Sequence, residues 1–246
     1  MNGAAVKNPS HVPLQVTAHL AHGFAAAQPW GIALDGILAS ELWSDHVASS
    51  EEPIAWPSET ANPPDLPLPL ARCTLAADPR LWHWAATCCQ PAGGHRTEIR
   101  YRHQQLDQNA VAALGRDPLP AALPTNQGRY RSRRMPLIVT VCATVTWSAI
   151  GDPDALRGLL QPINAIGKKR GHGEGTVTSW EVTPVHRPSW EAGHLHADGS
   201  LGRPCPAECL PAEMQTSHPS LTGLRPPYMH RSRQAPLYLP AFLDAV

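Results

Sequence analysis

The feature that most constrains the fold is a strand–helix–loop–strand succession in the second half of the chain. Residues 137–146 are rich in β-branched side chains, which predicts a strand that is buried on at least one side. Asp152 can then cap a helix that has Pro153 at its first position, and leucines at helical spacing supply the apolar face of that helix. Pro162 predicts that the helix is short or kinked. A glycine-rich loop leads into the strand 176–182, so this half of the chain predicts two strands joined through a helix.

The first half of the chain begins with the same kinds of element. Apolar and polar residues alternate over 12–19, which predicts a half-buried strand, and leucines at helical spacing follow within 32–47, where Asp35 suits the start of a helix. The order strand, helix, elaborated middle, strand, helix, strand indicates an α+β fold of the ferredoxin-like or RRM-like plan. We expect one elaborated domain over residues 1–246, with a long irregular insertion at 48–129 and an irregular C-terminal extension at 184–246. Within the insertion, the pattern predicts strands near 80–89 and 95–104 and a short helix near 106–114.

Composition narrows the class of protein. A chain of 246 residues can bury a proper core, and its 27 prolines predict many loops and short elements. There is no apolar run of about 18 residues or more, so we expect no membrane span. The N-terminal segment lacks the apolar stretch of a signal peptide, and we therefore expect a cytoplasmic protein without disulfide bonds.

Cysteines and histidines near the C-terminus raise the question of a metal. Cys205 and Cys209 follow His194 and His196, and four such ligands could hold zinc in a tetrahedral site. The spacing is not that of a standard zinc finger, so no metal and no cofactor is assigned from the sequence and the question stays open. The remaining cysteines in apolar stretches are interpreted as small core residues: Cys88, Cys89 and Cys142.

The glycine-rich loop is the strongest candidate for a binding site. It combines a cationic run with four glycines, which can expose backbone N–H groups to phosphates. A Walker A or Rossmann loop follows a strand and precedes a helix, whereas this loop follows a helix and precedes a strand, so neither nucleotide-binding motif fits. A tight turn with exposed cations is the alternative. The candidate residues of the loop are Gly167, Lys168, Lys169, Arg170, Gly171, His172, Gly173 and Gly175.

Three further clusters alternate arginines with a tyrosine, although the chain carries no net charge. Arginine binds phosphates bidentately and aromatic rings stack on bases, so these clusters are candidate RNA contacts. The alternative is a solvated strand edge. The candidates are Arg100 and Arg102; Arg129, Arg131, Arg133 and Arg134; and Arg225, Tyr228, Arg231 and Arg233.

Together, these segments resemble a known family. The segment "IGKKRGHGEG", between a helix and a last strand, resembles the glycine-rich loop of the RAMP superfamily of CRISPR-associated RNA-binding proteins. The start of the first helix resembles that superfamily's "LDG-LA" sequence through Leu34, Asp35, Gly36, Leu38 and Ala39. The tail "LRPPYMHRSRQAPLY" resembles the closing segment of the small type IV effector subunit of the five-type Cas family. Residues 48–129 show no matching feature.

The resemblance implies a non-catalytic subunit that binds and caps the 5′ handle of a crRNA. It implies as partners the crRNA, the backbone and large subunits of an effector complex, and target DNA. Some RAMP relatives are instead metal-independent endoribonucleases that process crRNA, and four histidines are candidates for that chemistry. A general RRM-like RNA binder is a third possibility, against which the absence of the aromatic RNP signature counts. The four histidines are His19, His22, His46 and His172.

Overall fold

The computed structural model describes residues 10–52, 54, 59–75, 78–114, 125–128, 131–215 and 217–243. Its centre is a four-stranded sheet with the order β4-β7-β1-β8, and every neighbouring pair is antiparallel. The strands are β1 (Val12–Leu20), β4 (Gln90–Pro91), β7 (Thr144–Gly151) and β8 (Val177–Pro184). The helix α1 (Leu34–Ser49) follows the first of these strands and α3 (Pro153–Leu160) follows the third. The fold is therefore α+β with the ferredoxin-like β-α-β-β-α-β order that the sequence predicts.

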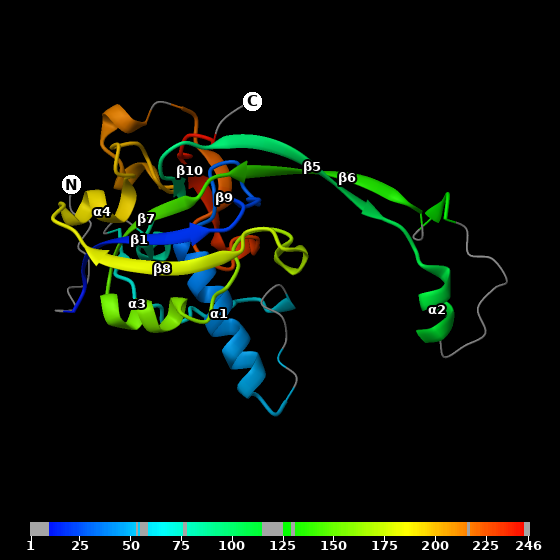
Figure 1. Ribbon diagram of the computed structural model, residues 1–246. Helices are drawn as coiled ribbons and strands as arrows, with labels where there is room; N and C mark the ends of the chain where they lie inside the picture. Colours follow the sequence, from blue (N-terminus) through cyan, green and yellow to red (C-terminus); the bar gives the residue numbers. More distant parts are fainter. Residues whose placement is uncertain are drawn as a thin grey trace.

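Alternation along β1 explains why this strand lies at the centre of the sheet. Leu14, Val16 and Ala18 are fully buried, and they pack with α1 and α3 in the main core. The two helices cover this face of the sheet, as Figure 1 shows. Asp152 caps α3 as expected, because its carboxylate accepts hydrogen bonds from two backbone N–H groups of the first turn. The helix ends at Leu160, before Pro162.

A long two-stranded arm projects from the body of the protein (Figure 1). It is formed by β5 (Arg96–Gln104) and β6 (Arg133–Val141), which pair antiparallel from Arg96↔Val141 to Gln104↔Arg133. The helix α2 (Gln108–Leu114) lies at its far end (Figure 1). The prediction of one strand over the β-branched run is wrong, because the run divides into β6 in the arm and β7 in the sheet. Only its β7 half is buried in the central sheet, and most of β6 is exposed.

The C-terminal part is more regular than the sequence indicates. The helix α4 (Ser189–His194) packs on β7 and β1, and β9 (Ser220–Gly223) pairs with β10 (Gln234–Leu237). In the insertion, β2 (Arg72–Cys73) and β3 (His83–Trp84) form a two-residue ladder. Short 3₁₀ turns complete the described chain at Pro79–Leu81, Arg170–His172, Ala207–Cys209, Ala212–Met214 and Arg231–Arg233. Within the described chain, no helix combines the length and apolarity needed to cross a bilayer.

Candidate nucleic-acid interface

The glycine-rich loop connects α3 to β8 and holds its cations at the surface. The backbone N–H of Lys168 donates to the carbonyl of Ala25 at 2.7 Å, which fixes the start of the loop on the segment after β1. Lys169 adopts the left-handed conformation with φ 61°, and Gly173 follows with φ 86°. Between them, Arg170 begins a 3₁₀ turn. The side chains of the three consecutive cations are exposed and available to a ligand.

The four glycines of the loop fall into two kinds. Gly167 and Gly175 both have positive φ, and a Cβ on either would overlap a backbone carbonyl, of Ala25 and Ile166 respectively. They are required for the close packing of the loop on the body. At Gly171 and Gly173 a Cβ would meet no atom within 4 Å, so these two positions leave open space for an approaching ligand.

Glu174 joins the loop to the arm. Its carboxylate is buried, and it accepts hydrogen bonds from Arg100 and Arg102 of β5 at 2.7 Å each. The same two arginines also donate to the carbonyls of His22 and His172. Arg100 and Arg102 therefore fix the middle of the arm to the loop, a contact that the lone acid in "GHGEG" could have indicated.

Next to the loop, segments that are distant in the sequence line one cleft of ≈ 600 Å³. Lys168 and Arg170 contribute from the loop, Gly36 from the start of α1, and Tyr228 and Met229 from the C-terminal tail. These are the three segments that carry the family resemblance. The fold thus brings the helix start, the glycine loop and the tail to a single concave surface.

A buried polar cluster holds the tail against α1 beside this cleft. The Tyr228 hydroxyl donates a hydrogen bond to the Asp35 carboxylate, and the guanidinium of Arg203 lies 3.9 Å from the other carboxylate oxygen. Burial raises the pKa of Asp35, while the Arg203 charge and the Tyr228 hydroxyl act in the opposite direction. Gly36 makes room for the tyrosine, since a Cβ there would lie 3.2 Å from its ring. The expectation that Asp35 serves the helix dipole therefore misses its main role, which is to bind the tail.

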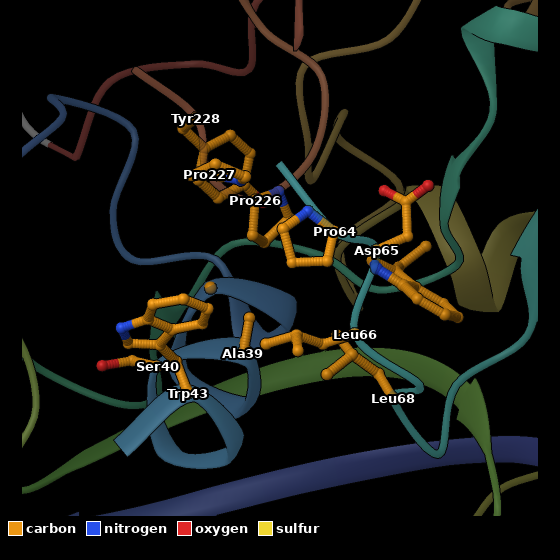
Figure 2. Close-up of a pocket in the computed structure, with 12 residues that line it drawn as sticks. Ala39, Ser40, Trp43, Pro64, Asp65, Leu66, Leu68, Pro226, Pro227 and Tyr228 are labelled. Carbon is orange, nitrogen blue, oxygen red and sulfur yellow. The ribbon is translucent and has the colours of Figure 1, made fainter. Parts of the chain in front are cut away.

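On the other side of Tyr228, the tail and α1 enclose an apolar pocket of ≈ 370 Å³. Figure 2 shows Trp43 of α1, Leu66 of the insertion and the prolines Pro226 and Pro227 around it. Its lining is mostly apolar, which does not suit a phosphate. The neighbouring cleft, in contrast, carries the exposed cations Lys168 and Arg170.

Comparison with known families agrees with this arrangement. The family described as "CRISPR type IV associated protein Csf3" matches residues 12–240, which is nearly the whole chain. The chain belongs to the Csf3 family. The match extends over the insertion and the tail as well as the central sheet, and it confirms the resemblance to a type IV CRISPR-associated protein. No curated protein matches the chain. Csf3 membership supports assignment to a type IV CRISPR effector subunit.

The arm of this Csf3 family member carries the second basic cluster. Arg131, Arg133 and Arg134 are exposed, whereas Arg129 lies outside the described residues. The guanidinium of Arg134 lies 3.9 Å from the centre of the Tyr101 ring on the opposite strand. This cation–π pair presents a stacked, positively charged surface of the kind that can face a base or a phosphate.

The tail cluster is divided between buried and exposed arginines. Arg225 donates to the carbonyls of Arg80 and Trp82, and it forms an ion pair with Asp65 at 3.4 Å. Arg233 is also buried and lies 2.8 Å from the same carboxylate. Arg231 is exposed. Because their donors are used inside the protein, Arg225 and Arg233 hold the tail on the insertion, and we do not include them in the proposed RNA contacts.

The four candidate histidines lie on separate elements. His19 on β1 hydrogen-bonds Glu181 of β8 at 3.0 Å, and the ring of His46 lies at 57° to that of Trp43 on α1. His22 and His172 are exposed beside the arm, and their backbone carbonyls accept hydrogen bonds from Arg100 and Arg102. These contacts do not pair any two of the four histidines as acid and base.

The structure brings together only two of the four residues that the sequence offers as zinc ligands. Cys209 and His194 do lie together, but their neighbours are Cys73 and His83 of the insertion. Cys205 instead belongs to the apolar packing, and its backbone pairs with Tyr238. Sequence reasoning missed Cys73 and His83 because strands of two residues leave no periodic pattern.

Replacing the Tyr228 hydroxyl is a direct test of the contact between tail and helix. We expect Tyr228→Phe to lower the free energy of unfolding by about 1–3 kcal/mol, because it removes a hydrogen bond to a buried carboxylate. Tyr238→Phe, in the same tail, serves as the control and should cost less than about 1 kcal/mol. Urea unfolding measures both, and equal values for the two variants would contradict the role given to Tyr228.

Proposed function

We propose that this protein is a non-catalytic RNA-binding subunit of a type IV CRISPR effector complex. In this proposal it holds the 5′ handle of the crRNA at the cleft between the glycine loop, the start of α1 and the tail. The observation that carries the proposal is the convergence of these three segments on one concave surface with Lys168 and Arg170 exposed at it.

The chemistry of the loop suits a phosphate backbone. Lys168, Lys169 and Arg170 present three adjacent positive charges, which bind phosphates by charge-assisted hydrogen bonds. Open space at Gly171 and Gly173 allows a backbone to approach closely. A single strand can then be held by charge, without a pocket shaped for one base.

The arm extends this surface away from the body. Its exposed residues include Arg131, Arg133 and Arg134 together with the apolar side chains Ile99 and Ile138. Glu174 binds Arg100 and Arg102 of β5, so the arm runs past the glycine loop, and Arg133 and Arg134 lie further out along it. The mixture of arginines and exposed apolar groups favours contact with both RNA and protein, in keeping with backbone and large subunits as neighbours and target DNA as a further ligand.

Removing two loop cations tests the proposal. We expect Lys168→Ala/Arg170→Ala to weaken binding of a repeat-derived single-stranded RNA and to reduce the slope of log K against log salt by about 0.7 for each lost phosphate contact. Lys169 is left in place, because its left-handed backbone is part of the turn, and a change there would not test charge alone. The measurement is a salt titration of RNA affinity on the full chain.

The matched control removes two cations elsewhere. Arg80 and Arg157 are exposed and remote from the cleft lining, so Arg80→Ala/Arg157→Ala should bind RNA as the unchanged protein does. Equal salt slopes for the two double variants would contradict the assignment. The RNA should also stay intact during incubation without added Mg²⁺, and cleavage within the repeat would replace the non-catalytic proposal with an endoribonuclease.

The handle assignment has its own readout. When the protein is expressed with its partner subunits, every RNA recovered from the complex should share one repeat-derived 5′ end. Random 5′ ends in the assembled complex would contradict handle binding, even if the loop cations still contribute to affinity.

A further inference from the structure

Four buried side chains outside the proposed interface come together in a pattern that the RNA proposal does not use. Cys73, His83, His194 and Cys209 each offer one ligand atom, and these atoms all lie within 4.8 Å of one another. All four residues are buried. Two thiols and two imidazoles gathered at one point are the ligand set of a structural zinc site.

Four short elements bring these residues together. Cys73 on β2 and His83 on β3 lie directly opposite each other in the ladder. His194 is the last residue of α4, and Cys209 ends the 3₁₀ turn Ala207–Cys209. The ligands thus come in two pairs, one from the insertion and one from the C-terminal extension.

The distances match a tetrahedral ion. With Zn–S near 2.3 Å and Zn–N near 2.0–2.1 Å, tetrahedral geometry places two sulfurs about 3.8 Å apart and two nitrogens about 3.3 Å apart. The Cys73 and Cys209 sulfurs are 3.6 Å apart, and the Nε2 atoms of His83 and His194 are 3.0 Å apart. The Cys209 sulfur lies 4.0 Å from Nε2 of His83. The widest separation within the cluster is at most 4.8 Å, so shifts of about 1 Å or less would place all four atoms around one ion.

Neighbouring groups fix the tautomer and the orientation of His194. The Nδ1 of His194 lies 2.7 Å from the carbonyl of Trp190, which can only accept, so Nδ1 carries the proton and Nε2 offers a lone pair. The Trp190 ring stacks on His194 and fixes its orientation.

Charge balance explains why such a site can be buried. Zn²⁺ with two thiolates and two neutral imidazoles has no net charge, so it avoids the cost of an isolated ion in an apolar interior. The surrounding residues are apolar, with Leu75 and Leu210 in the same buried cluster. With four protein ligands and no open coordination position, the site is structural and not catalytic.

We propose that Cys73, His83, His194 and Cys209 bind one structural Zn²⁺ that fastens the insertion to the C-terminal extension. Binding displaces the thiol protons to solvent and replaces the contacts between the four side chains by four metal bonds. This proposal is independent of RNA binding, because none of the four residues lines the cleft.

The first test is the metal content of the unchanged full-length protein. Purified from zinc-supplemented cells, it should contain about one zinc per chain by multi-element mass spectrometry, and chelation with TPEN should lower its melting temperature by about 5 °C or more. Replacement by Co²⁺ should give the visible absorption of a tetrahedral thiolate complex. Folded protein that holds no zinc and takes up neither ion would overturn the proposal, as would one equivalent of a different metal.

Variants then identify the ligands. Cys73→Ser and His83→Gln should lose most of the bound zinc, whereas Cys205→Ser and His196→Gln should keep it. The two controls are also buried and lie in the same part of the fold, but they are outside the four-residue cluster. Zinc retained by the first pair, or lost from the controls alone, would contradict the assignment. A chain whose mass is lower by two hydrogens, with the cross-link mapped to Cys73 and Cys209 by peptide mass spectrometry, would show a disulfide instead and would also overturn it.

Discussion

Gly175→Val is expected to lower the free energy of unfolding by about 3–5 kcal/mol. Gly175 has φ +70°, where a residue with a side chain costs about 1–2 kcal/mol and a β-branched one is especially strained. The new Cβ would also overlap the carbonyl of Ile166, so the end of the loop must shift, at a further cost of about 1–3 kcal/mol. That shift would break two backbone hydrogen bonds of Gly175, one to Gly23 and one from Ile166. Urea unfolding of the two proteins measures the difference.

Gly171→Val in the same loop is the matched control. A Cβ at Gly171 meets no atom within 4 Å, and the backbone there is not left-handed. The cost to folding should stay below about 1 kcal/mol, while RNA binding should fall if a phosphate backbone approaches this position. Equal destabilisation by the two valines would contradict the distinction between Gly175, which packs on the body, and Gly171, which faces open space.

Arg203→Met is expected to cost about 3–5 kcal/mol of unfolding free energy. The Arg203 guanidinium is buried and donates to the carbonyls of Trp84, Ala86 and Leu224. It is also the positive charge facing the buried Asp35 carboxylate. Methionine can fill the volume of the side chain. It leaves the three carbonyls and the Asp35 carboxylate without the guanidinium that faces them.

A double-mutant cycle separates these contributions. Adding Asp35→Asn to Arg203→Met removes the uncompensated acid, so the double variant should be more stable than the sum of the two single effects predicts. Arg80→Met is the control and should cost less than about 1 kcal/mol, because the Arg80 guanidinium is exposed and pairs with Asp78 at the surface. If Arg203→Met costs no more than this control, Arg203 does not organise the centre of the fold.

Strands β1 and β8 and helices α1 and α3 could be predicted because their sequences carry a period, whereas the two-residue strand β4 lies outside the strand expected at 80–89. Alternation gives β1, and Asp152 with Pro153 gives the start of α3. The arm could not be foreseen, since β-branched residues favour a strand without saying where it leaves the sheet. Val139 at the end of β6 is fully buried, whereas Ile138 beside it is 66% exposed. Only the pairing with β5 and with the body decides between these environments.

The sequence indicated which types of residue belong to the candidate site better than it indicated where each of them lies in the fold. The exposed cations of the glycine loop lie where a ligand could reach them, as the sequence suggests. Arg225 and Arg233 belong to the same kind of cluster by sequence, yet their donors bind carbonyls and Asp65 inside the protein. A local pattern cannot distinguish these cases, because the acceptors come from segments more than a hundred residues away.

The contact between Asp35 and Tyr228 spans 193 residues, and this separation sets an order of events during synthesis. The ribosome delivers α1 with its buried acid long before Arg203 and Tyr228 exist, and β1 emerges before either of its long sheet neighbours, β7 and β8. During synthesis β1 therefore lacks both of its long neighbours and α1 lacks the tail that packs on it, which slows folding and leaves unpaired strand edges exposed. Because Tyr228 packs on the start of α1, deletion of the tail from Tyr228 onward should destabilise the first helix as well as the C-terminal part.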